Sequence, residues 1–114
     1  MKSWITLKNT REFQRVYQER KSFANRYLIM YRAKNNLDIT RIGISVSKKV
    51  GNSVIRHRVT RLIRETFRLN QDWIQSGYDI VIVARETVKE QSFSEVDSAF
   101  MHLIRMHNLK ITNK

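Results

Sequence analysis

The sequence contains no cysteine and no proline, and only Gly43, Gly51 and Gly77 interrupt its 114 residues. Without cysteine there is neither a disulfide framework nor a thiolate metal site, which suits a reducing compartment such as the cytoplasm. No apolar run approaches the roughly 20 residues of a membrane helix. The first residues also lack an apolar signal region. We therefore expect a cytoplasmic protein with no membrane partner.

Acidic residues are scarce as well, and none of them form a catalytic group. Glu95 and Asp97 are two residues apart, so they do not share a helix face. His102 and His107 are five apart, whereas zinc chelation on a helix needs a spacing of four. No nucleophile motif is present. The sequence therefore predicts neither a catalytic site nor a metal site within this chain.

Positive charge is abundant and unevenly placed. The formal net charge is +12, from 22 Lys and Arg against ten Asp and Glu. Residues 1–47 carry +7, residues 48–68 carry +6, and residues 69–114 carry −1. This asymmetry favours a polyanionic partner, with nucleic acid ahead of a membrane surface.

Length and a hydrophobic fraction of 41% predict one folded domain over residues 1–114, without repeats or linkers. Apolar spacing and capping signals predict the order α-β-β-α-β-α. The predicted elements are a helix over 9–20, strands over 26–34 and 41–47, a helix over 53–70, a strand over 78–84, and a last helix that Ser92 or Ser94 caps. The strand over 78–84 is expected to be buried on both sides of the sheet. This pattern is typical of an α+β sandwich with helices on a mixed sheet.

The predicted strand over 41–47 has two unlike faces. Its apolar side chains are Ile42, Ile44 and Val46. Gly43, Ser45 and Ser47 alternate with them, and this face of small residues leaves room for something to approach the sheet closely.

The helix over 53–70 separates apolar from cationic side chains. At 100° per residue, its apolar side consists of Ile55, Val59, Leu62, Ile63 and Thr66. A cationic ridge of His57, Arg61, Arg64 and Arg68 lies nearly opposite, with Arg56 and Arg58 on the two flanks. A solvated helix face usually mixes charge signs, but here only Glu65 is acidic. We expect the ridge to bind a phosphate backbone, which relieves its self-repulsion.

The segment before this helix adds a second cationic feature. Lys48 and Lys49 precede Gly51, and Asn52-Ser53 caps the helix, whose first N–H groups favour an anion. The segment lacks the glycine spacing and the Lys-Ser/Thr ending of a nucleotide-binding loop.

The run from Lys48 to Glu65 closely resembles the signature of the bacterial ribonuclease P protein family. The core of that signature reads Arg-Asn-Arg, and this chain has Arg56-His57-Arg58 there, so histidine replaces asparagine. Further matches extend the likeness from Leu7 to His107, and they lie at residues 13–17, 22–26, 43–47 and 82–85.

The resemblance implies a fold and a function. The fold would be a two-layer sandwich like RNA-binding domains of ribosomal proteins and elongation factors, with a rare left-handed βαβ crossover. The function would be that of a non-catalytic subunit of an endoribonuclease, in which an RNA subunit with bound Mg²⁺ removes the 5′ leader of precursor tRNA. The implied partners are the catalytic RNA and precursor tRNA, not DNA.

The resemblance also implies two binding surfaces. The surface for the catalytic RNA consists of Lys48, Lys49, Asn52, Arg56, His57, Arg58, Arg61, Arg64 and Arg68. A cleft between the basic helix and the sheet would hold the leader, and its lining consists of Phe13, Tyr17, Tyr31, Ser45 and Ser47. Aromatic stacking beside a positive groove is how single-stranded RNA is commonly held. Phe13 is equally compatible with an ordinary place in the core.

Three other functions compete with this interpretation. A ribosomal RNA-binding protein or RNA chaperone would share the charge and the fold, but it does not need an aromatic cleft for single strands. A helix-turn-helix DNA reader needs a short helix before the basic helix, and here a strand precedes it. A membrane-surface helix is disfavoured because its apolar face lacks Trp and is needed for the core.

Overall fold

The computed structural model describes residues 5–111. Its helices are α1 (Thr10–Gln18), α2 (Ser53–Asn70) and α3 (Phe93–Met106), with short 3-10 turns η1 (Gln71–Trp73) and η2 (Glu86–Val88). Its strands are β1 (Ile5–Thr6), β2 (Ser22–Ala24), β3 (Leu28–Lys34), β4 (Arg41–Ser45) and β5 (Tyr78–Ala84). None of the helices within this range is both long and apolar enough to cross a membrane.

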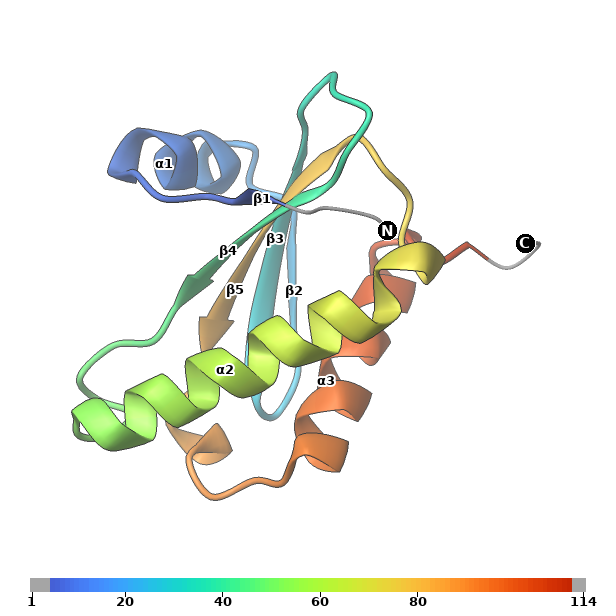
Figure 1. Cartoon of the computed structure of the whole chain (residues 1–114). Coiled ribbons are helices and arrows are strands. Elements are labelled where there is room, and N and C mark those ends of the chain that lie inside the picture. The colour runs from blue at the N-terminus through green and yellow to red at the C-terminus, as the bar shows by residue number, and fades with distance from the viewer. Residues whose placement is uncertain (1–4, 112–114) are drawn as a thin grey trace.

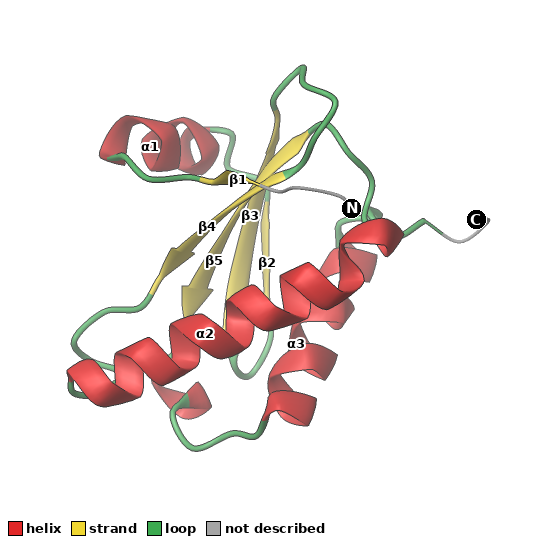
Figure 2. Ribbon diagram, viewed as in Figure 1, coloured by secondary structure: helices red, strands yellow, loops and turns green. Residues whose placement is uncertain are grey.

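The strands form one mixed sheet in the order β1-β4-β5-β3-β2 (Figure 2). The pairs β1–β4 and β4–β5 are parallel, and the pairs β3–β5 and β2–β3 are antiparallel. The chain passes from β4 to β5 through α2. With α2 in front of the sheet and both arrowheads pointing down, β5 lies to the right of β4 (Figure 1). This crossover is left-handed, an exception to a strong rule, as the resemblance implied.

Helices α2 and α3 close one face of the sheet with an apolar core. Side chains of β3, β4 and β5 meet both helices there. Ile42 and Ile82 of the sheet, Ile63 of α2 and Phe100 of α3 belong to this core and are fully buried. Phe67 of α2 packs edge-to-face on Phe100 of α3, with ring centroids 6.5 Å apart. The inner side of α2 is therefore occupied by the core, and only its outer side faces solvent.

Helix α1 packs on the other face of the sheet, over a smaller cluster. That cluster consists of Leu7, Val16, Ala33 and Val81, with Phe13, Tyr17, Tyr31 and Val83 partly buried around it. The helix begins with the predicted capping box, in which Asn9 and Glu12 each bond the other's backbone N–H. It covers only the end of the sheet where β4 and β5 begin, and the arrowheads of both strands point away from it (Figure 1).

The α+β fold, the mixed sheet and the order of the long elements are confirmed. Asn52 and Ser92 cap α2 and α3, and strand β5 is buried on both faces. Two strand boundaries were wrong, because β3 begins at Leu28 and β4 ends at Ser45. Strands β1 and β2 were not predicted, since two or three residues are too few to show an alternation.

Candidate nucleic-acid interface

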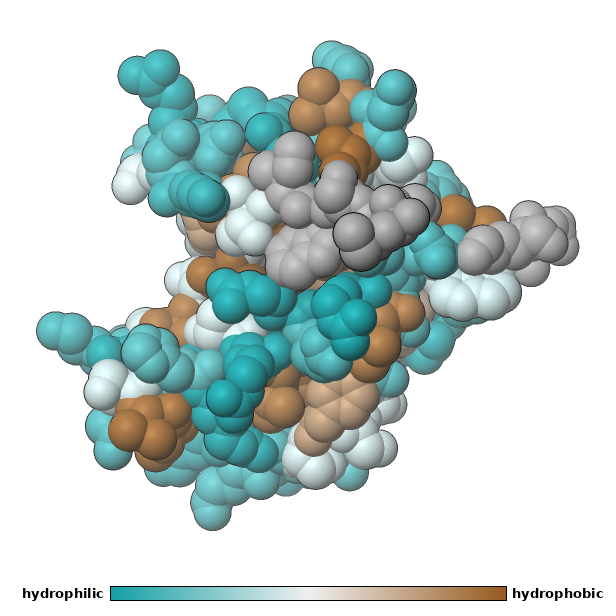
Figure 3. Space-filling view, viewed as in Figure 1, coloured by the Kyte–Doolittle hydropathy of each residue, from teal (hydrophilic) through white to brown (hydrophobic). Residues whose placement is uncertain are grey.

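The cationic ridge of α2 faces solvent along the middle of the helix. His57, Arg61 and Arg64 are exposed, and no hydrogen bond or ion pair to residues 5–111 engages Arg61 or Arg64. In the space-filling view, the most hydrophilic colour follows the course of α2 (Figure 3). The predicted separation of an apolar inner side and a cationic outer side is confirmed. Its two free guanidinium groups are placed to meet phosphates.

Arg68 stands apart from the rest of the ridge because it is paired. Its Nε and Nη2 donate to the two carboxylate oxygens of Glu65 at 2.9 and 2.7 Å. The hydrogen bonds from Arg68 hold the pKa of Glu65 below its ordinary value. The one acidic residue of the helix therefore neutralises this end of the ridge through an i,i+3 ion pair, and Arg68 offers less free charge than the prediction of a uniform ridge required.

The two flanking arginines are tied to the protein's own backbone. Arg58 Nη1 and Nη2 donate to the carbonyls of Lys89 and Gln91 at 3.1 and 2.6 Å. Arg56 Nη1 donates to the carbonyl of Gly51 at 3.2 Å. These bonds fix the start of α2 to the segment before α3 and to its own leading loop. Both side chains are only partly exposed. They therefore hold α2 in place and have fewer free N–H groups for a ligand.

The loop before α2 presents its cations at the end of β4. Lys48 and Lys49 lie in a turn and are exposed. Asn52 Oδ1 accepts a hydrogen bond from the backbone N–H of Ile55 at 3.0 Å. Asn52, a predicted RNA contact, is therefore also the N-cap of α2. Gly51 packs against Ile55, because a Cβ atom there would stand 2.9 Å from its side chain. The loop therefore follows α2 closely and extends the cationic surface around its start.

The predicted aromatic residues meet under α1, on the face of the sheet opposite to α2. The rings of Tyr17 and Tyr31 are edge-to-face with centroids 4.8 Å apart, and those of Phe13 and Tyr17 are 6.5 Å apart. The expected cleft between the basic helix and the sheet was therefore wrong, because the core fills that space. The aromatic surface lies instead between α1 and the sheet.

Strand register explains how the predicted small residues join this surface. Gly43 pairs with Val81, which pairs with Tyr31, and Ser45 pairs with Val83 on the same face. Phe13 packs directly over Gly43, and it is partly rather than fully buried.

Tyr17 is partly buried between Phe13 and Tyr31 in the aromatic group. Burial and the neighbouring Tyr31 raise the pKa of Tyr17, while a hydrogen bond with Ser45 acts in the opposite direction. Its phenol is therefore neutral at physiological pH and keeps a hydroxyl that can donate a hydrogen bond.

Beyond α1, the same face of the sheet is open. Val83 and Ile29 form a half-buried apolar surface there. A pocket of about 510 Å³ then opens where β4 and β5 end. Its lining consists of Ile29, Ser47, Lys49, Val50, Ala84, Arg85, Glu86 and Thr87. Ser47 from the predicted groove and Lys49 from the predicted cationic surface thus line one pocket, so the two predicted sites adjoin at this point.

A buried charged network was not predicted. The Asp79 side chain is fully buried at the start of β5, where Arg41 contacts both of its carboxylate oxygens and Arg15 reaches it from α1. An apolar strand that contains one aspartate was the available signal, because a buried charge needs paired partners. Arg15 and Arg41 consequently contribute less free charge than the sequence count suggests.

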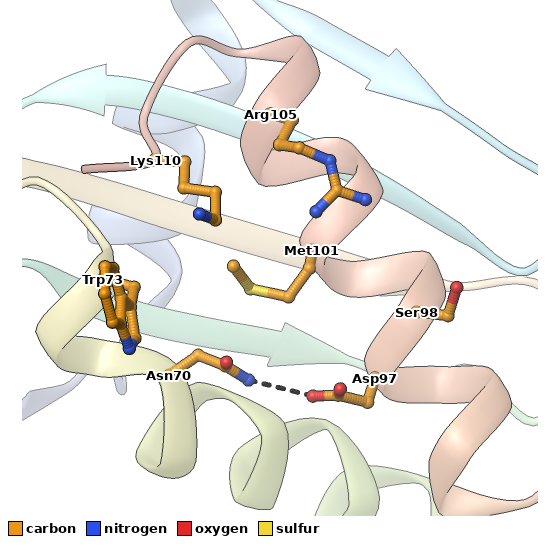
Figure 4. A pocket seen from close by; sticks show the side chains of 7 residues that line it. All are labelled: Asn70, Trp73, Asp97, Ser98, Met101, Arg105 and Lys110. Carbon is orange, nitrogen blue, oxygen red and sulfur yellow. Dashed lines mark hydrogen bonds between the residues drawn. The ribbon is translucent and has the colours of Figure 1, made fainter. Parts of the chain in front are cut away.

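A separate concave surface lies where α2 ends against α3 (Figure 4). Lys110 Nζ lies 5.2 Å from the ring centroid of Trp73, and Asn70 Nδ2 donates to Asp97 at 2.9 Å. Arg105 lies in the last turn of α3, where a cation offsets the negative end of the helix dipole. Because these groups serve the protein's own structure, we do not assign this surface to nucleic acid.

Between residues 5 and 111, no three His, Asp or Glu side chains gather closely enough to hold a metal ion. The residues that do gather are cationic or aromatic. Together these features define a class of protein, a small basic α+β protein with one cationic helix and one partly open, aromatic-lined sheet face.

Comparison with known proteins identifies the family. The family model described as Ribonuclease P matches residues 1–108. A ribonuclease P protein component of Lachnoclostridium phytofermentans is 59% identical over 104 residues, which cover 91% of this chain and 90% of that protein. The RNase P protein of Staphylococcus aureus has 34% identity and a TM-score of 0.84, over 91% of this chain and 95% of that one. The Thermotoga maritima RNase P protein has 31% identity and a TM-score of 0.82, over 89% and 96%.

The chain belongs to the ribonuclease P protein family. This membership implies a subunit of an endoribonuclease and a role in tRNA processing. It also implies an RNA partner within a ribonucleoprotein.

Proposed function

We propose that this chain holds the catalytic RNA of ribonuclease P on α2 and the 5′ leader of precursor tRNA on the α1 face of the sheet. By doing so it promotes endonucleolytic removal of the leader in the cytoplasm, with neither DNA nor a membrane as partner. One observation carries the proposal. The cationic ridge and the aromatic face are on opposite sides of one sheet, and Lys49 of the predicted cationic surface and Ser47 of the predicted groove line one pocket at the end of β4.

Each surface suits its proposed ligand for a different physical reason. Arg61 and Arg64 are exposed planar cations without partners in the described chain, and a folded RNA offers them rows of phosphate oxygens. Tyr17 and Tyr31 are partly exposed beside the half-buried Val83 and Ile29, and an unpaired leader offers bases that can stack on their rings. A duplex would not expose its base faces in this way.

The chain's own contribution is binding and positioning. Its side chains hold substrate and RNA subunit in a fixed relation, which reduces the entropy lost when the two meet. Mg²⁺ bound by the RNA subunit would supply the activated water and stabilise the leaving oxygen.

Reconstitution tests this division of labour. The chain is mixed with a bacterial ribonuclease P RNA, and leader removal from precursor tRNA is assayed at low Mg²⁺. We expect the mixture to be active and the protein, rigorously freed of RNA, to be inactive. Robust cleavage by the protein alone would overturn the accessory role. No stimulation of the RNA would favour the alternative of a ribosomal RNA-binding protein or an RNA chaperone.

Two variants separate the surfaces. Arg61→Ala with Arg64→Ala is expected to weaken binding of the catalytic RNA, and each lost phosphate contact should flatten the salt slope by about 0.7–0.9. Tyr17→Ala is expected to weaken binding of precursor tRNA more than binding of leaderless tRNA. If Tyr17→Ala affects both substrates equally, the α1 face is not the leader site.

A further inference from the structure

Helix α1 carries two charged side chains that reach the same buried centre on the sheet. Arg15 Nη2 contacts Asp79 Oδ2. Arg41 binds the same carboxylate with both edges of its guanidinium, Nε to Oδ1 at 2.8 Å and Nη2 to Oδ2 at 2.7 Å. Asn35 Nδ2 donates to Oδ1 at 2.9 Å. Four side-chain bonds from three partners therefore satisfy a fully buried carboxylate.

The network returns to the helix where it began. Arg41 Nη1 lies 3.5 Å from Glu12 Oε2, and Glu12 is also the acidic partner of the capping box. Arg15 makes a second attachment to the sheet, because its Nη1 donates to the carbonyl of Lys34 at 3.2 Å. A chain of alternating charges thus runs from α1 through β5 and β4 and back to α1.

Such a network is costly to break. Burial alone would raise the pKa of Asp79, but hydrogen bonds from Arg41 and Asn35 outweigh it and hold the pKa below its ordinary value. The carboxylate therefore stays ionised, and removal of one partner leaves buried charge uncompensated. A nine-residue helix is marginal by itself, so its place on the sheet depends on contacts of this kind.

The network and the aromatic residues occupy opposite flanks of α1. At 100° per residue, Glu12 and Arg15 lie on one flank and Phe13 and Tyr17 on the other, with the fully buried Val16 between them. The charged flank therefore fixes how the helix is rotated about its own axis. That rotation sets where Phe13 and Tyr17 stand over the sheet.

We infer that Asp79, acting through Arg15, is a positioning residue for the leader groove. It does not touch the leader, but it holds α1 in the orientation in which the aromatic rings line the open face. This inference rests on the proposed function of that face. It makes the ion pair between Arg15 and the buried Asp79 responsible for where the aromatic rings stand.

The test uses Arg15→Met in the reconstituted ribonucleoprotein, with Arg11→Met as the matched control. Arg11 lies on the same helix and is exposed, and no ion pair to residues 5–111 involves it. Both variants remove one positive charge. The affinities for precursor tRNA and for leaderless tRNA are measured for each variant over a salt series. Thermal unfolding is followed in parallel.

Arg15→Met is expected to lower the preference for precursor tRNA about threefold to tenfold, the effect of losing its bonds to Asp79 and to the carbonyl of Lys34. The salt slope should stay at the wild-type value, because no phosphate contact is lost. Arg11→Met should change the preference less, and Arg15→Lys should recover part of it. Asp79→Asn, where it folds, should act like Arg15→Met. Affinity for the catalytic RNA should be unchanged in Arg15→Met.

Three results would overturn the inference. They are a full leader preference in Arg15→Met, an equal loss in Arg11→Met, and a slope flattened by about 0.7, which indicates a direct phosphate contact. Tyr17→Ala in the same assay distinguishes a failure of the positioning role from a failure of the leader site itself. If Tyr17→Ala loses leader preference and Arg15→Met does not, only the positioning role fails. If neither loses it, the leader site itself is misplaced.

Discussion

The two faces of the sheet are built differently. Under α2 and α3 the sheet is sealed by large apolar side chains, and Phe67, Phe100 and Ile63 are almost wholly buried. Under α1 the apolar cluster is small, a charged network supplies part of the attachment, and the far half of the face is left open. The first face supplies stability, and the surface proposed for the catalytic RNA is the outer side of its helix α2. The second face buries less apolar area, and this leaves open the surface proposed for the leader.

A matched pair of aromatic truncations should give the largest effect. Phe100→Ala removes a fully buried ring and should lower the free energy of unfolding by about 3–5 kcal/mol. Phe13→Ala removes a ring that is only partly buried under α1, and the loss should be about 0.8–1.5 kcal/mol, half the transfer free energy of a buried phenylalanine. Urea denaturation of both variants measures the difference. Equal losses would show that the α1 face contributes as much stability as the sealed face.

Within the basic helix, Arg58 and Arg61 should separate support from binding. Arg58→Ala loses two bonds to backbone carbonyls and should lower the free energy of unfolding by about 1.5–3 kcal/mol. Arg61→Ala touches no described partner and should stay within about 0.5 kcal/mol of wild type.

Affinity for the catalytic RNA supplies the second measurement on this pair. Arg61→Ala should flatten the salt slope by about 0.7–0.9, the contribution of one phosphate contact. Arg58→Ala should change the slope less. If Arg58→Ala leaves stability unchanged but flattens the salt slope by about 0.7–0.9, then Arg58 binds the RNA directly.

Acid should weaken the sealed face through His107. This side chain is buried, its Nε2 lies 2.9 Å from the carbonyl of Met30, and its ring packs edge-to-face on Phe23. Burial, together with the nearby Arg32, lowers the pKa of His107 from its ordinary value of 6.5. The unfolded chain therefore binds the proton first, and stability that is complete above pH 6.5 is lost as the pH falls below it.

Unfolding free energies between pH 7.5 and pH 5.5, a range of about one unit on either side of the ordinary histidine pKa, test this dependence. His107→Gln should reduce the fall that wild type shows, whereas the exposed His57→Gln should retain it. An equal pH dependence in all three proteins would remove His107 from the explanation.

The smallest expected effect is a slight gain in affinity for the catalytic RNA. Glu65→Gln abolishes the only ion pair between two α2 side chains in the described part of the chain and releases Arg68. Because the pair is exposed, the unfolding midpoint should hardly move. Affinity for the catalytic RNA should rise slightly, and the salt slope should steepen by at most about 0.9. Weaker RNA binding in Glu65→Gln would mean that the pair orders the end of the ridge for its ligand.

Local signals predicted most of the fold. The capping residues Asn9, Asn52 and Ser92, the alternation along β4 and the continuous apolar run of β5 located the long elements, because these signals act within a few residues. Strand β2 is different, since it follows a turn in which Arg20 adopts a φ of 56°. A non-glycine residue in that conformation gives no turn signal in the sequence.

The candidate site was predictable to the extent that it depends on one helix. Helical geometry placed Arg61 and Arg64 correctly on the outside of α2. The carbonyl partners of Arg58 are 31 and 33 residues further along the chain, so its supporting role had no local signature. The same limit applies to the aromatic residues. The family resemblance groups them in one surface, but the side of the sheet they occupy depends on where α1 packs.

The depth of the aromatic surface follows from the smallest residue beneath it. A Cβ atom on Gly43 would stand 2.7 Å from Phe13 Cζ and 3.2 Å from Leu7 Cβ. An alanine there would lift the ring away from the strand, and α1 would have to tilt or lose its contact with Val81 and Tyr31. Gly43 is buried below the rings, and because it has no methyl group it sets how deep the surface proposed for the leader can be.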